Sequence, residues 1–261
     1  VIKPVDSRGA RGVIRITKSL DLEWAFEYAK SFSPTSRVMV EEFLEGQQYS
    51  TESVIMDEKN ITLGFSERNY EFLEELSPYI IENGGQQPAK IDKKELDSIV
   101  KLIEKSSQIL GISNATSKGD VVMTKEGPKI IEIAPRLSGG YFSSDQIELA
   151  TGINITEIAI RLSLGEKINK DKLHFSYQKF VAIRYFFPKP GKITSISNID
   201  SFKNESWVHK LNLFFRVGDV LEKVTDHTKR CGFVITTGNT RDEAVERAKT
   251  VVKNIQILTR Q

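Results

Sequence analysis

One segment, residues 119–136, constrains the fold of this chain more than any other. It reads GDVVMTKEGPKIIEIAPR, and its two runs of β-branched residues on either side of a short glycine-containing turn are typical of a β-hairpin. If Thr124 pairs with Pro128, the loop has three residues and its glycine takes the left-handed position. This register places Asp120 directly opposite Glu132, where two like charges repel each other.

The two carboxylates predict a metal site. Strand alternation puts Glu132, Ala134 and Arg136 on one face of the hairpin. Opposed carboxylates favour a cation between them, and Mg²⁺ prefers carboxylate oxygen that it shares with substrate phosphates. The alternative is a solvated hairpin with two unrelated acids. The three isoleucines of the second run favour the metal site, because they predict a buried strand and acids are rarely buried without a partner.

The composition excludes several classes of protein. The 261 residues suffice for one large or two modest domains, and 39% hydrophobic with 28% charged residues is typical of a globular chain. A net charge of +2 leaves no electrostatic footprint for nucleic acid or an anionic membrane, so we expect neither partner. No apolar run approaches the ~18 residues that span a bilayer. The one cysteine, Cys231, cannot form an internal disulfide, which predicts a reducing, cytoplasmic location.

Local patterns predict several further elements. The first residues, Val1-Ile2-Lys3-Pro4, look like the end of a strand, so we expect the chain to be cut from a longer one. Residues 70–89 are polar and contain glycines and prolines, which predicts an irregular segment that is functional or disordered. Capping boxes predict three helix starts, at Asp92 with Glu95, Asn154 with Glu157 and Thr240 with Glu243.

Two weaker signals lie near the start of the chain. The loop 6–12 carries two glycines and follows Lys3, and backbone N–H groups in such a loop can bind an anion while the lysine supplies a charge for phosphate. A plain β-turn is the alternative. The segment Glu41–Leu44 ends a predicted strand and can present its backbone to an adenine edge, although an ordinary acidic strand end has the same composition.

The order of these pieces resembles the ATP-grasp superfamily. Its members include the large chain of carbamoyl-phosphate synthetase, biotin carboxylase and the L-amino acid ligases, and the likeness runs from Val1 to about Arg161 and more loosely beyond. It implies an α+β ATP-grasp fold of antiparallel sheets with helices, followed by a strand-rich C-terminal domain, and it implies that an N-terminal domain is lacking. The implied domains are a partial lid at 1–45, a core with the metal site at 46–170 and an appended α/β domain at 171–261.

The resemblance assigns the phosphate-binding residues by position. Lys3 matches the lysine that holds the nucleotide phosphates. Ser7, Gly9 and Gly12 belong to the segment that matches the flexible glycine loop closing over them. The sequence therefore predicts that all four contact the phosphates of ATP.

A second group is assigned to the rest of the nucleotide. Glu41 matches the acid that faces the adenine amino group, and the segment Glu42-Phe43-Leu44 matches the backbone that reads the adenine edge. Gln48 stands where many members have an acid for the ribose hydroxyls, and an amide can also hydrogen-bond a hydroxyl.

The metal-binding and catalytic positions follow. Asp120 and Glu132 match the carboxylates that bridge Mg²⁺ or Mn²⁺, while Arg136 matches the arginine that steadies the transferred phosphate and acts with Lys3 as a catalytic residue. Many members have an asparagine at the position of Ala134 that helps to hold a second magnesium. A methyl group cannot bind a cation, so either Glu132 bridges both ions with water in the gap or only one ion binds tightly.

The activity that this resemblance implies is an ATP- and Mg²⁺-dependent ligase. It would join a small-molecule carboxylate to an amine or to ammonia through an acyl phosphate, with release of ADP and phosphate. The sequence does not specify the two substrates, and it leaves a homodimer open. The alternative is an ATP-binding module, or a truncated fragment without catalytic activity, which Ala134 and the lacking N-terminal domain favour.

Overall fold

An eight-stranded antiparallel sheet organises the chain, whose computed structural model describes residues 1–57, 59–174 and 176–260. In spatial order its strands are β10 (Val208–Leu213), β12 (Gly232–Gly238), β8 (Phe180–Tyr185), β5 (Gly84–Gln87), β4 (Lys59–Asn69), β3 (Gln47–Met56), β6 (Ala115–Thr124) and β7 (Gly127–Ala134). A two-stranded sheet pairs β1 (Ile2–Pro4) with β2 (Val38–Val40), and a three-stranded sheet contains β11 (Val220–Leu221), β9 (Gly191–Ser197) and β13 (Gln256–Arg260). This mixed α and β architecture confirms the predicted fold class.

Helices pack on both faces of the large sheet and, in the case of the first helix, on the small sheet β1–β2. They are α1 (Leu22–Ser31), α2 (Lys93–Ile109), α3 (Ile147–Thr151), α4 (Ile155–Ser163), α5 (Asp200–Lys203) and α6 (Arg241–Asn254), with short turns η1 (Phe142–Gln146), η2 (Lys170–Leu173) and η3 (His227–Lys229). The three predicted helix starts are confirmed, because the Asp92, Asn154 and Thr240 side chains each accept a hydrogen bond from the backbone N–H three residues later and so act as N-caps.

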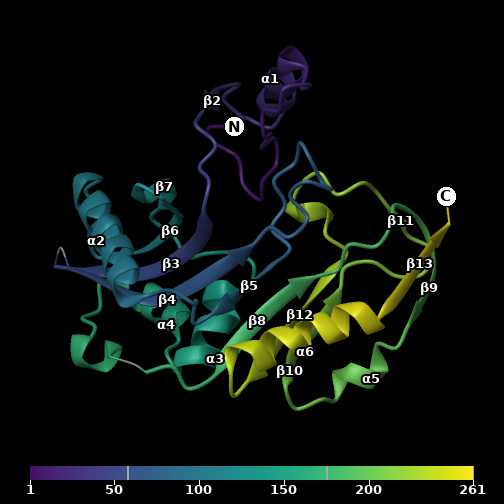
Figure 1. Cartoon of the computed structure of the whole chain (residues 1–261). Coiled ribbons are helices and arrows are strands. Elements are labelled where there is room, and N and C mark those ends of the chain that lie inside the picture. Colours follow the sequence, from purple (N-terminus) through teal and green to yellow (C-terminus); the bar gives the residue numbers. More distant parts are fainter. Residues whose placement is uncertain (58, 175, 261) are drawn as a thin grey trace.

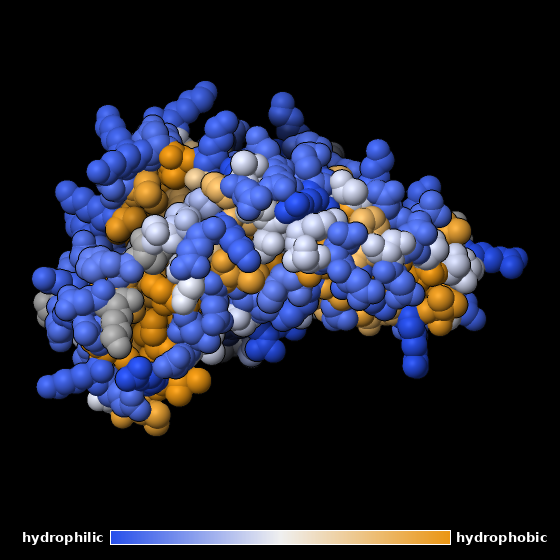
Figure 2. Space-filling view, turned by 90° about the horizontal axis from the view of Figure 1, so that it is seen from below, coloured by the Kyte–Doolittle hydropathy of each residue, from blue (hydrophilic) through white to orange (hydrophobic). Residues whose placement is uncertain are grey.

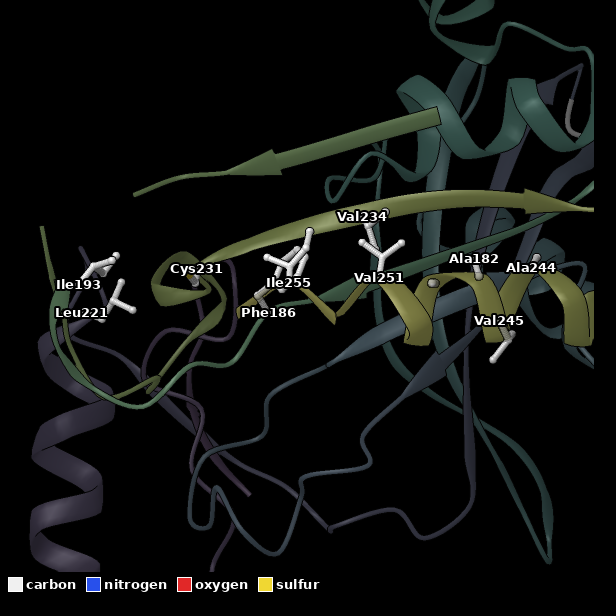
Figure 3. Packing of buried hydrophobic residues seen from close by; sticks show 11 residues of the cluster. Ala182, Phe186, Ile193, Leu221, Cys231, Val234, Ala244, Val245, Val251 and Ile255 are labelled. Carbon is white, nitrogen blue, oxygen red and sulfur yellow. The ribbon is translucent and has the colours of Figure 1, made fainter. Parts of the chain in front are cut away.

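The core is divided among these layers. Ile99 and Ile103 of α2 pack against one face of β3, β4 and β6, while η1, α3 and α4 cover the opposite face of β3 and β4. At the other end of the sheet, α6 packs on β8 and β12, with Val251 and Val234 in one buried cluster (Figure 3). The small sheet β1–β2 and helix α1 stand apart above the large sheet (Figure 1).

Strand β5 joins the two halves of the large sheet. It lies between β4 and β8, so the sheet continues across residue 170, where the sequence predicts a domain boundary. The irregular segment predicted at 70–89 therefore contains a fully buried strand, and that prediction was wrong for Gly84–Gln87. This strand has no apolar alternation that the sequence could reveal. Its buried Gln86 can be polar because its side-chain oxygen accepts hydrogen bonds from Asn69 and Arg184.

Strand β7 lies at the edge of the sheet, and its residues are partly exposed. The prediction of a buried strand was therefore wrong. Ile130 and Ile133 pack against the α2 side of the core, but an edge strand has a neighbour on one side only. The side chain of Glu132 keeps 47% of its surface exposed as a result.

The surface is largely polar. Figure 2 shows that hydrophilic side chains cover most of one face and that apolar side chains gather there in separate patches. Within the described residues, no helix combines the length and the apolar character that crossing a bilayer requires.

Gly46, at the start of β3, offers a test of how the small sheet is joined to the core. Its φ is +146°, and a Cβ atom there would lie 2.0 Å from the carbonyl oxygen of Met123. We expect Gly46→Ala to lower the free energy of unfolding by about 1–3 kcal/mol, because backbone atoms cannot move aside without disturbing β6. Urea denaturation measures the change. Gly139→Ala is the control, since nothing lies within 4 Å of its Cβ position, and equal stability of the two variants would contradict this account.

Candidate nucleotide and metal site

The β6–β7 hairpin places Asp120 directly opposite Glu132, which confirms the predicted pairing. The predicted three-residue loop is wrong. Thr124 pairs with Gly127 across a two-residue turn, and a bulge between Asp120 and Val121 then shifts the register by one residue. A longer loop and a bulge on the same strand add the same number of residues, so the spacing alone could not distinguish them.

Asp120 is a buried, ionised carboxylate. Its Oδ1 accepts a hydrogen bond from Ser50 Oγ at 2.7 Å, and its Oδ2 accepts from Arg68 Nη1 at 2.9 Å and from Lys118 Nζ at 2.6 Å. Burial alone would raise the pKa of Asp120, but Arg68 and Lys118 outweigh burial and hold this pKa at about 2. The carboxylate therefore stays negative at neutral pH.

Lys118 lies between the two acids. Its Nζ donates to Glu132 Oε1 at 2.6 Å as well as to Asp120, and Arg136 Nη2 lies 3.7 Å from the same Glu132 oxygen. Lys118 is not among the predicted site residues. The available signal was strand alternation, since a residue two positions before Asp120 shares its face, and Lys118 is the cross-strand partner of Ala134.

Asp120 and Glu132 could hold a magnesium ion whose remaining ligands come from a substrate. Among the residues that the structure describes, no group of three or more His, Cys, Asp or Glu side chains is arranged to hold a metal by itself. Two opposed carboxylates are what Mg²⁺ uses when phosphate oxygens complete its shell. The presence of Lys118 between them is the feature that a metal would have to accommodate.

The segment after Arg136 is held from inside the protein. Glu52 is buried, and its Oε2 accepts hydrogen bonds from Ser138 N at 2.9 Å and from Ser143 Oγ at 2.5 Å. Burial raises the pKa of Glu52, with the two serines acting in the opposite direction. The glycine-containing turn at 138–140 is thereby attached to β3, which carries Ser50 and Glu52 on the site face.

Lys3 and Glu41 form an ion pair in the small sheet. They come together because β1 and β2 are antiparallel, with Lys3 opposite Met39 and the Glu41 N–H donating to the Val1 carbonyl oxygen at 2.9 Å. Glu42 has an exposed side chain 3.8 Å from Lys129. Among the described residues, the ion-pair partner of Lys3 is Glu41 and neither carboxylate of the hairpin.

A cavity of about 420 Å³ lies where the small sheet meets the core. Three residues predicted to bind the nucleotide, Phe43, Leu44 and Gln48, line it. The guanidinium of Arg15 covers the Phe43 ring at 4.6 Å from its centroid. The remaining lining residues are Glu45, Gly46, Gln47, Arg68, Tyr70, Leu73 and Ile80.

The glycine loop is docked on the C-terminal half of the chain. Gly9 and Ala10 both have left-handed φ values, of 67° and 58°, and the carbonyl oxygen of Gly9 accepts from His227 N at 2.9 Å. Gly12 packs closely on Phe32, where a Cβ would lie 3.0 Å from a ring carbon. Ser7 is half-buried. The predicted phosphate loop thus forms a defined turn that contacts η3.

His227 connects the glycine loop to Glu82, which lies just before β5. Its Nε2 accepts a hydrogen bond from the backbone N–H of Glu82 at 3.3 Å, which requires the neutral ring. Burial, followed by the nearby Arg230, holds the pKa of His227 well below its usual range. The ring therefore stays neutral at physiological pH.

Arg68 links the cavity to the carboxylate pair. It lines the cavity, donates to Asp120, and donates from Nη2 to Glu82 Oε2 at 3.0 Å. Glu82 also lies 3.7 Å from Arg230, whose guanidinium covers the Tyr185 ring at 3.8 Å. Arg68 and Arg230 are not among the predicted site residues, because no local pattern connects them with Asp120 or Glu82.

The predicted site residues other than Glu42, which lies near Lys129, thus fall into three groups in space. Asp120, Glu132 and Arg136 contact one another through Lys118 or directly. Phe43, Leu44 and Gln48 share the cavity, and Arg68 joins these two groups. Lys3 with Glu41, and the loop of Ser7, Gly9 and Gly12, belong to the part above the sheet.

Comparison with known proteins gives this arrangement a family. Residues 1–140 match the model of the ATP-grasp domain, and residues 184–260 match that of the L-amino acid ligase C-terminal domain 2. This chain belongs to the ATP-grasp family. The membership confirms the resemblance inferred from the sequence, and members of the family are ATP-dependent ligases.

Individual relatives are distant. The chain is 24% identical to an uncharacterized protein of Sinorhizobium fredii, over 98% of this chain and 52% of that protein. It is also 24% identical to dapdiamide A synthase of Enterobacter agglomerans, over 90% of this chain and 56% of the synthase. The crystal structure of an L-amino acid ligase from Bacillus licheniformis superposes with a TM-score of 0.83 at 18% identity, covering 100% of this chain and 63% of the ligase. The chain spans about half the length of the curated relatives it matches.

Arg68 keeps only 14% of its side chain exposed and contacts the buried Asp120, which predicts a large effect of its removal. In Arg68→Gln, Asp120 and Glu82 lose their shared cation while the side chain keeps some hydrogen-bonding capacity. We expect the free energy of unfolding to fall by about 3 kcal/mol, because removing one partner of a buried carboxylate is strongly destabilising, although Lys118 still contacts Asp120 and Arg230 still lies near Glu82. Urea unfolding at neutral pH checks this. Arg136→Gln removes an exposed guanidinium from the same site and should barely change stability; matching losses in both variants would show that burial is not the cause.

Proposed function

We propose that this chain supplies the nucleotide and metal site of a ligase that joins a carboxylate to an amine or to ammonia. The observation that carries the proposal is the opposed pair Asp120 and Glu132, connected through Arg68 to a cavity lined by Phe43, Leu44 and Gln48. The family supports an ATP-dependent ligation. Asp120, whose pKa Arg68 and Lys118 lower, and Glu132 lie near a cavity with aromatic and amide walls, and this arrangement suits a nucleotide whose phosphates approach the hairpin.

The proposed reaction has two steps. A carboxylate oxygen of the substrate attacks the γ-phosphorus of ATP, the bond to the β,γ-bridging oxygen breaks, and ADP leaves an acyl phosphate behind. The amine then attacks the acyl carbon, loses a proton and expels inorganic phosphate. When Mg²⁺ or Mn²⁺ is bound, held by Asp120 and Glu132, it supplies positive charge to the phosphates.

The chain's own residues position and neutralise the reactants in this proposal. Arg136 lies beside Glu132 on an exposed edge and steadies the transferred phosphoryl group. Lys3 contacts the phosphates by releasing Glu41, which then faces the adenine amino group. Ser7, Gly9 and Gly12 cover the phosphates with backbone N–H groups, and the hydrogen bond from His227 N to the Gly9 carbonyl oxygen positions the loop.

The adenine and ribose contacts are assigned to the cavity. The backbone of Glu42, Phe43 and Leu44 reads the adenine edge, and the Gln48 amide hydrogen-bonds a ribose hydroxyl. The names of the relatives, an L-amino acid ligase and dapdiamide A synthase, favour amino-acid-like carboxylate and amine substrates. These partners are proposed for the whole protein, since the chain spans only part of its relatives.

Glu132→Gln tests the proposal in the complete gene product that contains this chain. The amide keeps the size of the side chain but removes the charge that Mg²⁺ requires, so we expect ADP release to fall at least about a hundredfold. ADP and phosphate are measured against a panel of paired amino acids as carboxylate and amine donors. Nucleotide affinity, measured with a fluorescent ATP analogue, should change much less.

Glu126→Gln is the matched control, because Glu126 lies exposed in the turn of the same hairpin and pairs with Lys129. It should retain full activity. Undiminished ADP release by Glu132→Gln would sink the proposed role of the carboxylate pair. Tight ATP binding by the unaltered protein without ADP release, across the whole panel, would instead support the alternative of a nucleotide-binding module.

A further inference from the structure

Lys118 occupies a place in the hairpin that the proposed reaction does not explain. It stands on β6 between Glu52 of β3 and Ala134 of β7, its cross-strand partners. Its ammonium lies 2.6 Å from an oxygen of Asp120 and 2.6 Å from an oxygen of Glu132. Only 13% of its side chain is exposed.

The charge of this ammonium is needed where it lies. Asp120 and Glu132 face each other across the two strands, and Glu52 lies buried beside them, so three acids share one face of the sheet. Opposed like charges destabilise a sheet, and a lysine is rarely buried unless it is paired. Both requirements are met when Lys118 bridges the two opposed carboxylates.

The small side chain at position 134 permits the bridge. Directly opposed residues have Cβ atoms roughly 4.5–5.5 Å apart, so a larger group at Ala134 would compete with the lysine for the space beside Glu132. Ala134 offers neither bulk nor a ligand. The pair of Lys118 with Ala134 therefore places a fixed positive charge where a larger polar residue could have held a second ion.

The carboxylate oxygens are also largely taken. Both oxygens of Asp120 accept hydrogen bonds from Ser50, Arg68 or Lys118, and Glu132 Oε1 accepts from Lys118. Within the described residues, Glu132 Oε2 is the only oxygen of the pair with no such partner. With Lys118, Arg68 and Arg136 around two acids, little negative charge remains for more than one divalent ion.

We propose that Lys118 is a built-in cation of the site that takes the place of a second divalent ion, so that the site holds one divalent ion per nucleotide. The inference rests on the proposed function for its nucleotide. It gives Lys118 a positioning role. The ammonium keeps Asp120 and Glu132 in register when no metal is present, and it neutralises part of the negative charge of the phosphates when ATP is bound.

The test measures binding of Mn²⁺ to the complete gene product by electron paramagnetic resonance of free Mn²⁺. One arm uses the metal alone, and the other adds adenylyl imidodiphosphate. We expect one Mn²⁺ per chain in the unaltered protein with the nucleotide analogue. Lys118→Met, which keeps the length of the side chain and removes its charge, should bind Mn²⁺ alone at least about tenfold more tightly and should take two ions with the analogue.

Two further variants guard the interpretation. Lys118→Arg keeps the charge and should behave like the unaltered protein, and Lys125→Met removes an exposed lysine of the same hairpin turn and should change nothing. Circular dichroism shows whether each variant is folded. Two ions in the unaltered protein, or equal Mn²⁺ binding by Lys118→Met and Lys125→Met in both arms, would overturn the inference. The metal-only arm needs no nucleotide and no turnover, so it gives a result even if the proposed ligase reaction fails.

Discussion

The ionised state of Asp120 is the condition on which the rest of the site depends. A carboxyl group this deeply buried would lose its charge without partners, and Arg68 and Lys118 prevent that loss. Each of these cations has a second acidic partner, Glu82 for Arg68 and Glu132 for Lys118. The result is a continuous network of alternating charges from the hairpin edge into the centre of the sheet.

The same network joins the two family regions. The ATP-grasp match ends at residue 140 and the C-terminal match begins at 184, yet both contribute strands to one sheet through β5. Glu82 meets Arg230 across this junction, and His227 contacts both Glu82 and the Gly9 carbonyl. The C-terminal region therefore contacts Glu82, the second acidic partner of Arg68, and the Gly9 loop.

The sequence predicted those features of the site that depend on nearby residues. The pairing of Asp120 with Glu132 follows from a hairpin whose two strands are consecutive in the sequence. The helix starts at Asp92, Asn154 and Thr240 follow from N-cap side chains that bind the backbone only three residues later. The predicted turn was wrong, because a three-residue loop and a two-residue turn with a bulge beside Asp120 give the same pairing of Asp120 with Glu132. The prediction that β7 is buried was wrong, because the residues of a strand do not specify whether it lies at the edge of its sheet.

By itself, then, the sequence determined the hairpin, its opposed acids and the family to which they point, since these are encoded within short stretches of chain. Only the tertiary structure decided that a distant cation, Arg68, holds Asp120. Arg68 lies 52 residues from Asp120, and Glu82 lies 148 residues from Arg230. Strand β5 is likewise stabilised by Asn69 and Arg184 and not by an apolar pattern of its own. Such ion pairs and buried hydrogen bonds form between groups that folding brings together from distant parts of the chain, and no local periodicity predicts them.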